Sequence, residues 1–146
     1  MTARRASILA TAVVLIAVVW LLQRHALIGT GAVAIALQVV AVALMAWARL
    51  TFGRRSYHFA ANPTAGGLVT VGPYRFWRHP IYASILLFVW SGVLSHAFNP
   101  LSFALAAVAT LATGVRIAAE EQLLRSTFPE YAAYAGRTKR LIPFVF

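Results

Sequence analysis

The sequence predicts an all-α fold: a multi-pass membrane helical bundle with four transmembrane helices and a cytoplasmic C-terminal helical segment. Hydrophobic residues make up 61% of the 146 residues and charged residues only 11%, whereas about 25% are charged in a soluble globular domain. The apolar residues gather in three charge-free runs, residues 6–23, 27–48 and 80–115. Because about 20 apolar residues cross the hydrocarbon core, the first two runs predict one span each and the third predicts two.

The first run predicts a helix rather than a cleaved signal peptide. It is longer than the usual apolar stretch of about 7–15 residues, and no small-residue cleavage site follows it. The second span follows a short outer connection that contains Gly29 and Gly31. Gln38 is the strongly polar side chain inside this span, and we expect it to make an interhelical hydrogen bond rather than to contact a ligand.

The third run is interrupted by a polar turn with a helix-breaking proline at residues 96–100, which predicts a hairpin of two short spans. Pro80 is a favourable first helical residue, so His79 is expected at the helix cap. The last span should continue past Arg116 to Arg125, where residues 128–129 break it before a short helix over residues 129–134.

The net charge of +10 is distributed in a way that predicts the orientation. With both termini in the cytoplasm, Arg24 is the only one of the 13 basic residues outside the inner segments, as the positive-inside rule requires. This pattern favours membrane lipids with anionic headgroups as partners, and it lacks the basic face of a folded nucleic-acid-binding module. The absence of cysteine excludes disulfides and thiolate chemistry, and no metal site is predicted.

Two polar clusters flank the last two spans, one at residues 72–82 and one around Glu120 and Glu121. The glutamates have the spacing of ordinary helical ion pairs with Arg116 and Arg125. However, adjacent carboxylates near hydrocarbon point about 100° apart on a helix and need compensating cations. The combination favours a ligand with both charge signs and a flat ring, and S-adenosylmethionine is such a ligand.

The motifs Gly-Pro-Tyr-x-x-x-Arg-His-Pro-x-Tyr at 72–82, Glu-Glu-x-x-Leu at 120–124 and Phe-Pro-x-Tyr-x-x-Tyr at 128–134 resemble the isoprenylcysteine carboxyl methyltransferase and phospholipid methyltransferase superfamily. The resemblance implies a single membrane domain over residues 1–146, with two N-terminal spans in 1–50 and a cofactor-binding core in 51–146. It implies catalytic roles for Arg78, His79 and Glu121. The cofactor-binding residues that it implies are Tyr74, His79, Pro80, Tyr82, Glu120, Glu121, Tyr131, Tyr134 and Arg137 or Arg140.

The implied function is S-adenosylmethionine-dependent methylation of a lipid-like or membrane-soluble acceptor, such as an isoprenylcysteine-type carboxylate. A carboxylate acceptor needs no general base, whereas an amine or thiol would need one, for which His79 is the candidate. The composition is typical of bacteria and predicts the inner membrane. The chain is shorter than the eukaryotic enzymes, so the spans that shape their substrate tunnel are absent or come from a second copy in a homo-oligomer.

Three alternatives stay open. NADPH-dependent sterol-reductase-like enzymes share the Arg-His-Pro-x-Tyr feature, but they typically have asparagine where this chain has Ile81 and an aspartate in their acidic motif. A small four-helix transporter would need an ionisable residue within a span, and the three acidic residues lie elsewhere. A structural membrane subunit is the third alternative.

Overall fold

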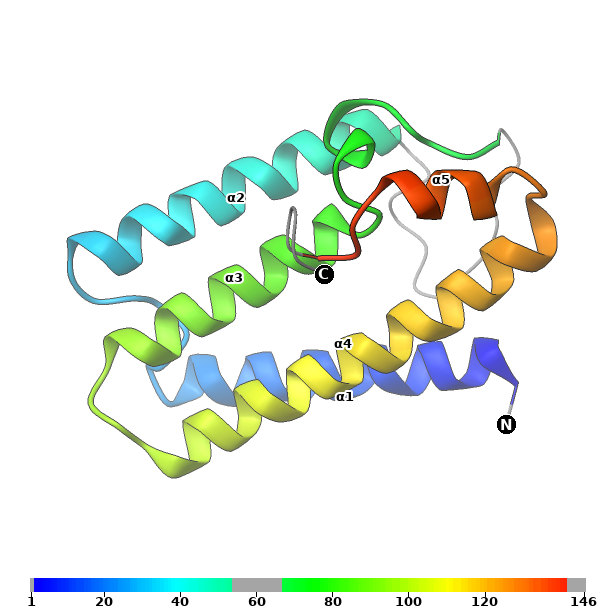
Figure 1. The fold of residues 1–146 in the computed structure, drawn as a ribbon. Coiled ribbons are helices and arrows are strands. Elements are labelled where there is room, and N and C mark those ends of the chain that lie inside the picture. Colours follow the sequence, from blue (N-terminus) through cyan, green and yellow to red (C-terminus); the bar gives the residue numbers. More distant parts are fainter. Residues whose placement is uncertain (1, 54–66, 142–146) are drawn as a thin grey trace.

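The computed structural model describes residues 2–53 and 67–141, and this part of the chain is all-helical, as predicted (Figure 1). The α-helices are α1 (Ala3–Gln23), α2 (Ala32–Phe52), α3 (Pro80–Ser95), α4 (Pro100–Thr127) and α5 (Tyr131–Arg137), with a 3-10 helix η2 (Gly72–Arg75) before α3. Residue 1, residues 54–66 and residues 142–146 lie outside the described part.

Three helices, α1, α2 and α4, are long and apolar enough to cross a membrane. The fourth apolar helix, α3, has 16 residues, which corresponds to about 24 Å of rise against a hydrocarbon thickness of about 30 Å. The chain is therefore a membrane protein with three long candidate spans and one shorter apolar helix.

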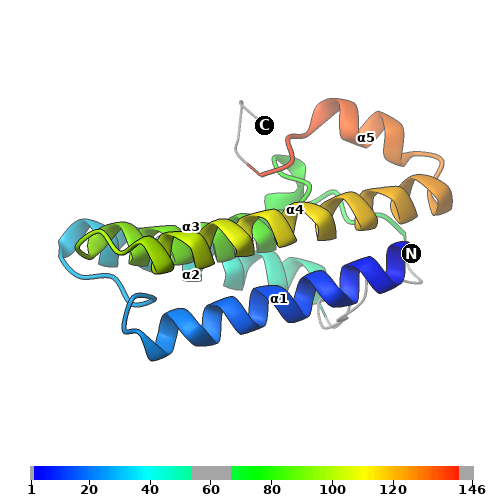
Figure 2. The same ribbon diagram turned by 90° about the horizontal axis from the view of Figure 1, so that it is seen from below.

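The long helices form two antiparallel pairs, in which α1 packs against α4 and α2 packs against α3 (Figures 1 and 2). The α3 and α4 helices join the two pairs through a smaller contact. Helix α5 and η2 lie at the end of the bundle where α1 begins, away from the turn between α3 and α4 (Figure 1). The residues of both predicted polar clusters are thereby brought to one end.

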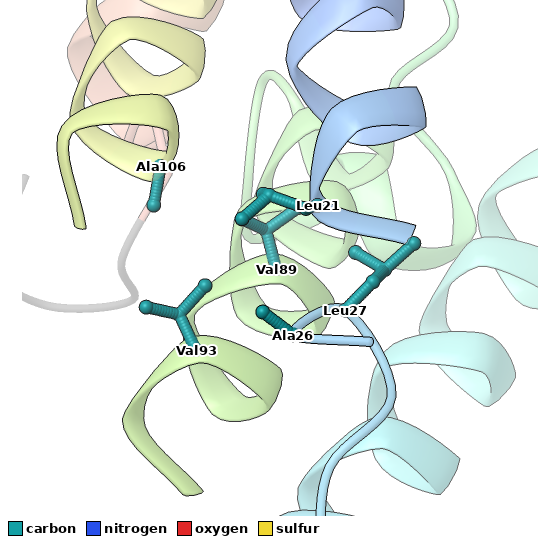
Figure 3. Packing of buried hydrophobic residues seen from close by; sticks show 6 residues of the cluster. All are labelled: Leu21, Ala26, Leu27, Val89, Val93 and Ala106. Atoms are coloured by element: carbon teal, nitrogen blue, oxygen red, sulfur yellow. The ribbon is translucent and has the colours of Figure 1, made fainter. Parts of the chain in front are cut away.

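The apolar core lies toward the opposite end, where the segment after α1 inserts beside α3 (Figure 3). It comprises Leu21, Ala26, Leu27, Val89, Val93 and Ala106. Gly92 allows this close approach, because a Cβ atom there would lie 2.1 Å from the carbonyl oxygen of Leu27. A backbone segment, not only helix faces, therefore completes the core.

The segment between α1 and α2 contains Gly29 and Gly31, as predicted for the outer connection, and α2 begins at Ala32. Within this segment Ala26 and Leu27 are buried, and Gly31 adopts a positive φ of 84°. Gln38 holds the segment in place. Its side chain accepts from Gly29 N at 3.0 Å and donates to the carbonyl oxygens of Leu27 at 2.8 Å and Phe88 at 3.2 Å, so the predicted interhelical hydrogen bond is confirmed.

The other predicted boundaries agree with the structure within a few residues. Asn99 caps α4 by accepting from the backbone N–H groups of Leu101 and Ser102, both at 3.1 Å, so the hairpin turn is where the sequence placed it. The long α4 runs on to Thr127, and the short last helix covers residues 131–137 instead of 129–134. His79 occupies the N-cap position of α3 but makes no side-chain capping bond.

Candidate functional site

The site begins where the segment before α3 pairs with the segment after α5. Trp77 and Lys139 form an isolated parallel bridge. Arg78 N donates to Lys139 O at 2.7 Å, and His79 N donates to Arg140 O at 3.1 Å. Backbone hydrogen bonds thus hold the C-terminal segment against the Arg-His-Pro corner, and the side chains of 78, 79 and 140 share one location.

Glu121, on α4, is the carboxylate on which these side chains converge. Its Oε1 accepts from Arg78 Nε at 3.0 Å and lies 3.4 Å from His79 Nε2. Arg140 donates from Nη2 to Oε2 at 3.2 Å. The Glu121 side chain is only 5% exposed, so this is a buried carboxylate compensated by charge-assisted hydrogen bonds.

Arg78 also connects Glu121 to the end of α5. Its Nη1 donates to the carbonyl oxygens of Ala135 at 2.7 Å and Thr138 at 2.6 Å. Carbonyl groups at a helix C-terminus lack intrahelical donors and carry partial negative charge, so a cation there is favourable. Arg78 therefore binds α3, α4 and α5 together, and both oxygens of Glu121 are occupied by protein groups.

Glu120 is placed differently. Its Oε2 accepts from the hydroxyl of Tyr82 at 2.7 Å, and the Tyr82 ring stacks on His79 with centroids 5.6 Å apart. Among the residues that the structure describes, no hydrogen-bond donor reaches Glu120 Oε1. The two glutamates are thus separated as the helical geometry predicts: Glu121 is enclosed by protein cations, and Glu120 keeps one acceptor oxygen.

The two glutamates do not form the ion pairs within their own helix that their spacing to Arg116 and Arg125 suggested. Within the described ranges, neither Arg116 with Glu120 nor Glu121 with Arg125 forms a direct ion pair. Arg125 instead lies over the ring of Tyr131, with its Cζ 5.5 Å from the centroid. The acidic pair is therefore compensated mainly from other elements.

The tyrosines of α5 complete the site. Tyr134 donates from its hydroxyl to Tyr74 O at 2.7 Å, and burial raises the pKa of Tyr134 to about 12, so this donor stays protonated at neutral pH. Tyr131 is 1% exposed. Its hydroxyl and the indole Nε1 of Trp77 are buried donors for which the described part of the chain offers no acceptor. Such groups are costly unless something accepts from them.

Most of the residues predicted for the site therefore lie together, although binding itself stays a prediction. Arg137 is exposed at the end of α5, whereas Arg140, the other arginine considered, reaches Glu121. The sequence did not assign Arg116 or Thr11 to the site. Arg116 donates from Nε to the Tyr82 hydroxyl at 2.6 Å and from Nη1 to Thr11 Oγ1 on α1. The four-residue spacing between Arg116 and Glu120 could have indicated that Arg116 belongs to the site. No feature of the sequence distinguishes Thr11 from the other residues of its apolar run.

A hollow of about 450 Å³ lies beside this cluster, between the end of α2 and residues 68–71. The described residues of its lining include Phe52, whose ring contacts that of Tyr74 at 5.4 Å, and among them are no charged side chain and none of the predicted site residues. The candidate site is therefore defined by the polar cluster on α3, α4 and α5.

The sequence of this chain was compared with known protein families and proteins. The family model described as the isoprenylcysteine carboxyl methyltransferase (ICMT) family matches residues 32–126, which is more than half of the chain. The cobalt-zinc-cadmium resistance protein CzcN of Cupriavidus metallidurans is 41% identical over 80 residues, covering 52% of this chain and 35% of that protein. The nickel-cobalt-cadmium resistance protein NccN of Alcaligenes xylosoxydans xylosoxydans is 39% identical over 80 residues, covering 52% and 36%.

The matched region thus spans about a third of each of these relatives. No solved structure matches the chain. The family match includes α2, α3 and most of α4, and with them the Arg-His-Pro corner and both glutamates. The chain belongs to the isoprenylcysteine carboxyl methyltransferase family.

Proposed function

We propose that this protein is an S-adenosylmethionine-dependent membrane methyltransferase that acts on a lipid-like acceptor. The family supports methyl transfer in general. The observation that carries the proposal is the gathering of Arg78, His79, Glu120 and Glu121 at one end of an apolar bundle. Polar groups at such a position are costly and commonly serve a ligand.

The residues present fit the cofactor. Glu120 offers an acceptor oxygen to the ammonium or to the ribose hydroxyls, and the unpaired donors of Tyr131 and Trp77 suit carboxylate or adenine acceptors. The Tyr82–His79 stack offers aromatic faces to the adenine ring or the sulfonium. Glu121 is expected to act on the ligand indirectly, because its oxygens are held by Arg78 and Arg140.

When bound, S-adenosylmethionine supplies an electrophilic methyl group on a sulfonium leaving group that needs no protonation. The protein then has to align the acceptor and exclude water. For a carboxylate acceptor no base is needed. For an amine or thiol, His79 would take the proton at Nδ1, because its Nε2 faces Glu121 Oε1 at 3.4 Å, and this carboxylate would stabilise the resulting imidazolium.

The proposal includes a membrane arrangement. It takes α3 as a fourth span and places the polar cluster and both termini on the cytoplasmic side of a bacterial inner membrane. Residues 51–146 would form the cofactor-binding core and residues 1–50 the two preceding spans, with membrane lipids around them and a second copy as a further candidate partner. A cytoplasmic site would receive the soluble cofactor from one side and the acceptor from the bilayer.

The names of the two relatives refer to metal resistance. Within the described residues, no three histidine, cysteine or acidic side chains lie close enough to hold a metal ion. If this chain has a role in resistance, we propose that it acts through methylation of a membrane component.

Calorimetry with the purified full chain in detergent tests the cofactor assignment. The wild type should bind S-adenosylmethionine, and Glu120→Gln should bind it about 10- to 150-fold more weakly, because a hydrogen bond to a charged group contributes about 1.5–3 kcal/mol. Glu130→Gln makes the same change at an exposed residue and should leave affinity unchanged. Binding of NADPH without S-adenosylmethionine would overturn the proposal and favour a reductase.

A further inference from the structure

Arg116 lies where three helices meet. It belongs to α4, just after the apolar run that ends at Val115. Its Nη1 contacts Thr11 Oγ1 on α1, and its Nε contacts the Tyr82 hydroxyl on α3 at 2.6 Å. The guanidinium Cζ also lies 5.5 Å from the centroid of the Tyr82 ring. Its planar fork of donors can reach both helices at once, which a lysine ammonium cannot do in the same geometry.

The direction of each hydrogen bond follows from the donors. Arginine only donates and a carboxylate only accepts. Tyr82 must therefore accept from Arg116 and donate its own proton to Glu120 Oε2 at 2.7 Å. On the other side, Thr11 accepts from Arg116 and donates to Ser7 O at 2.8 Å. The chain of hydrogen bonds allows one arrangement of protons.

We propose that Arg116, held by Thr11 of α1, is a positioning residue that directs the Tyr82 hydroxyl proton to Glu120 Oε2 and leaves Oε1 for the cationic or hydroxyl groups of the cofactor. This inference rests on the proposed function. It assigns α1, which lies outside the matched residues 32–126, a part in ligand binding beyond its packing against α4.

The chain offers a matched control for Thr11. Thr110, on α4, donates to the carbonyl four residues earlier, Ala106 O, at 2.8 Å and accepts from Trp90 Nε1 at 3.0 Å. It thus has the same hydrogen-bonding pattern as Thr11, including an acceptor role toward another helix, without a connection to the acidic pair. Thr11→Val and Thr110→Val remove the same hydroxyl from similar environments.

Infrared spectroscopy of the purified full chain tests the arrangement without any ligand. The chain has only three acidic side chains, Glu120, Glu121 and Glu130, so the Glu120 carboxylate band can be assigned by its loss in Glu120→Gln. Thr11→Val should move this band toward its position in Tyr82→Phe, whereas Thr110→Val should not move it and Thr11→Ser should restore it. A band that shifts in Tyr82→Phe but stays unchanged in Thr11→Val overturns the positioning role.

Calorimetry then tests whether the arrangement serves the ligand. Thr11→Val should weaken S-adenosylmethionine binding about three- to tenfold, as expected for the loss of a hydrogen bond acting through an intermediate, and should have no added effect in a Tyr82→Phe background. Equal affinity in Thr11→Val and the wild type would show that the contact between Arg116 and Thr11 only stabilises the packing of α1. A wild type that does not bind this cofactor would overturn the proposed function, and the infrared shift would still decide the role of Thr11.

Discussion

Replacing Glu121 by glutamine tests whether this carboxylate holds the site together. The substitution keeps the shape of the side chain and one acceptor oxygen but removes the negative charge. It also directs an amide N–H₂ group toward donors, because Arg78 and Arg140 both donate to the carboxylate. We expect the loss to appear as reduced stability of the contacts between α3, α4 and the C-terminal segment.

The size of the effect follows from burial. Removing one partner of a buried ion pair costs about 3–5 kcal/mol, and the Arg78 and Glu121 side chains are only 10% and 5% exposed. Arg78 keeps its bonds to Ala135 O and Thr138 O, which lowers the cost. Arg140 is 41% exposed, so its pair contributes at most about 1 kcal/mol. We therefore expect a loss of about 3 kcal/mol.

Thermal unfolding of the purified protein measures this loss. For a chain of this size, about 3 kcal/mol corresponds to a decrease in Tm of about 6–12 °C. Glu130→Gln is the control, since Glu130 is exposed and surface substitutions usually change stability by less than about 0.5 kcal/mol. Equal Tm values for Glu121→Gln and Glu130→Gln would refute the assignment of Glu121 as the central ion-pair partner.

Three further predictions concern other parts of the structure. Gly92→Ala should lower Tm strongly, because the new Cβ would lie 2.1 Å from Leu27 O and overpacking costs about 1–3 kcal/mol or more; an unchanged Tm would contradict the close packing. The pKa of Tyr134 is raised by burial from 10.0 to about 12, so its contribution to stability is present below pH 10 and lost as the pH rises toward 12, and denaturation curves should show a smaller alkaline loss in Tyr134→Phe. His79→Ala should reduce methyl transfer in a radiolabel assay. Undiminished turnover would show that His79 has no role in catalysis and serves only as the N-cap residue of α3.

The arrangement of helices could be predicted well because its signals are local. Charge-free runs set the long helices, and Asn99 and Pro100 marked the turn between α3 and α4. Gly29 and Gly31 marked the connection before α2, which begins at Ala32, but nothing in the sequence indicated that this connection contributes to the core. In the fold Leu27 is a buried loop residue, in contact with Gly92, which is distant in sequence. Tertiary packing, not hydropathy, decides such burial.

The residue types of the candidate site were also predictable, but their partners were not. Two adjacent glutamates among three acidic residues indicated that cations must converge there. The contact of Glu121 with Arg140 depends on how the segment after α5 folds back, and the contact of Glu120 with Tyr82 depends on how α3 lies beside α4. No spacing in the sequence encodes either arrangement. For the same reason, the sequence could not decide whether Arg137 or Arg140 contacts Glu121.

The most direct test of the proposed methyltransferase activity is transfer of a labelled methyl group. Purified wild-type protein is incubated with methyl-labelled S-adenosylmethionine and total membrane lipids, and the lipid fraction is separated and analysed. We expect label in a lipid-like product that depends on the protein and that decreases in Glu120→Gln but not in Glu130→Gln. Protein that binds the cofactor but labels no lipid would contradict the proposed acceptor class, and protein that neither binds the cofactor nor transfers label would contradict the central claim.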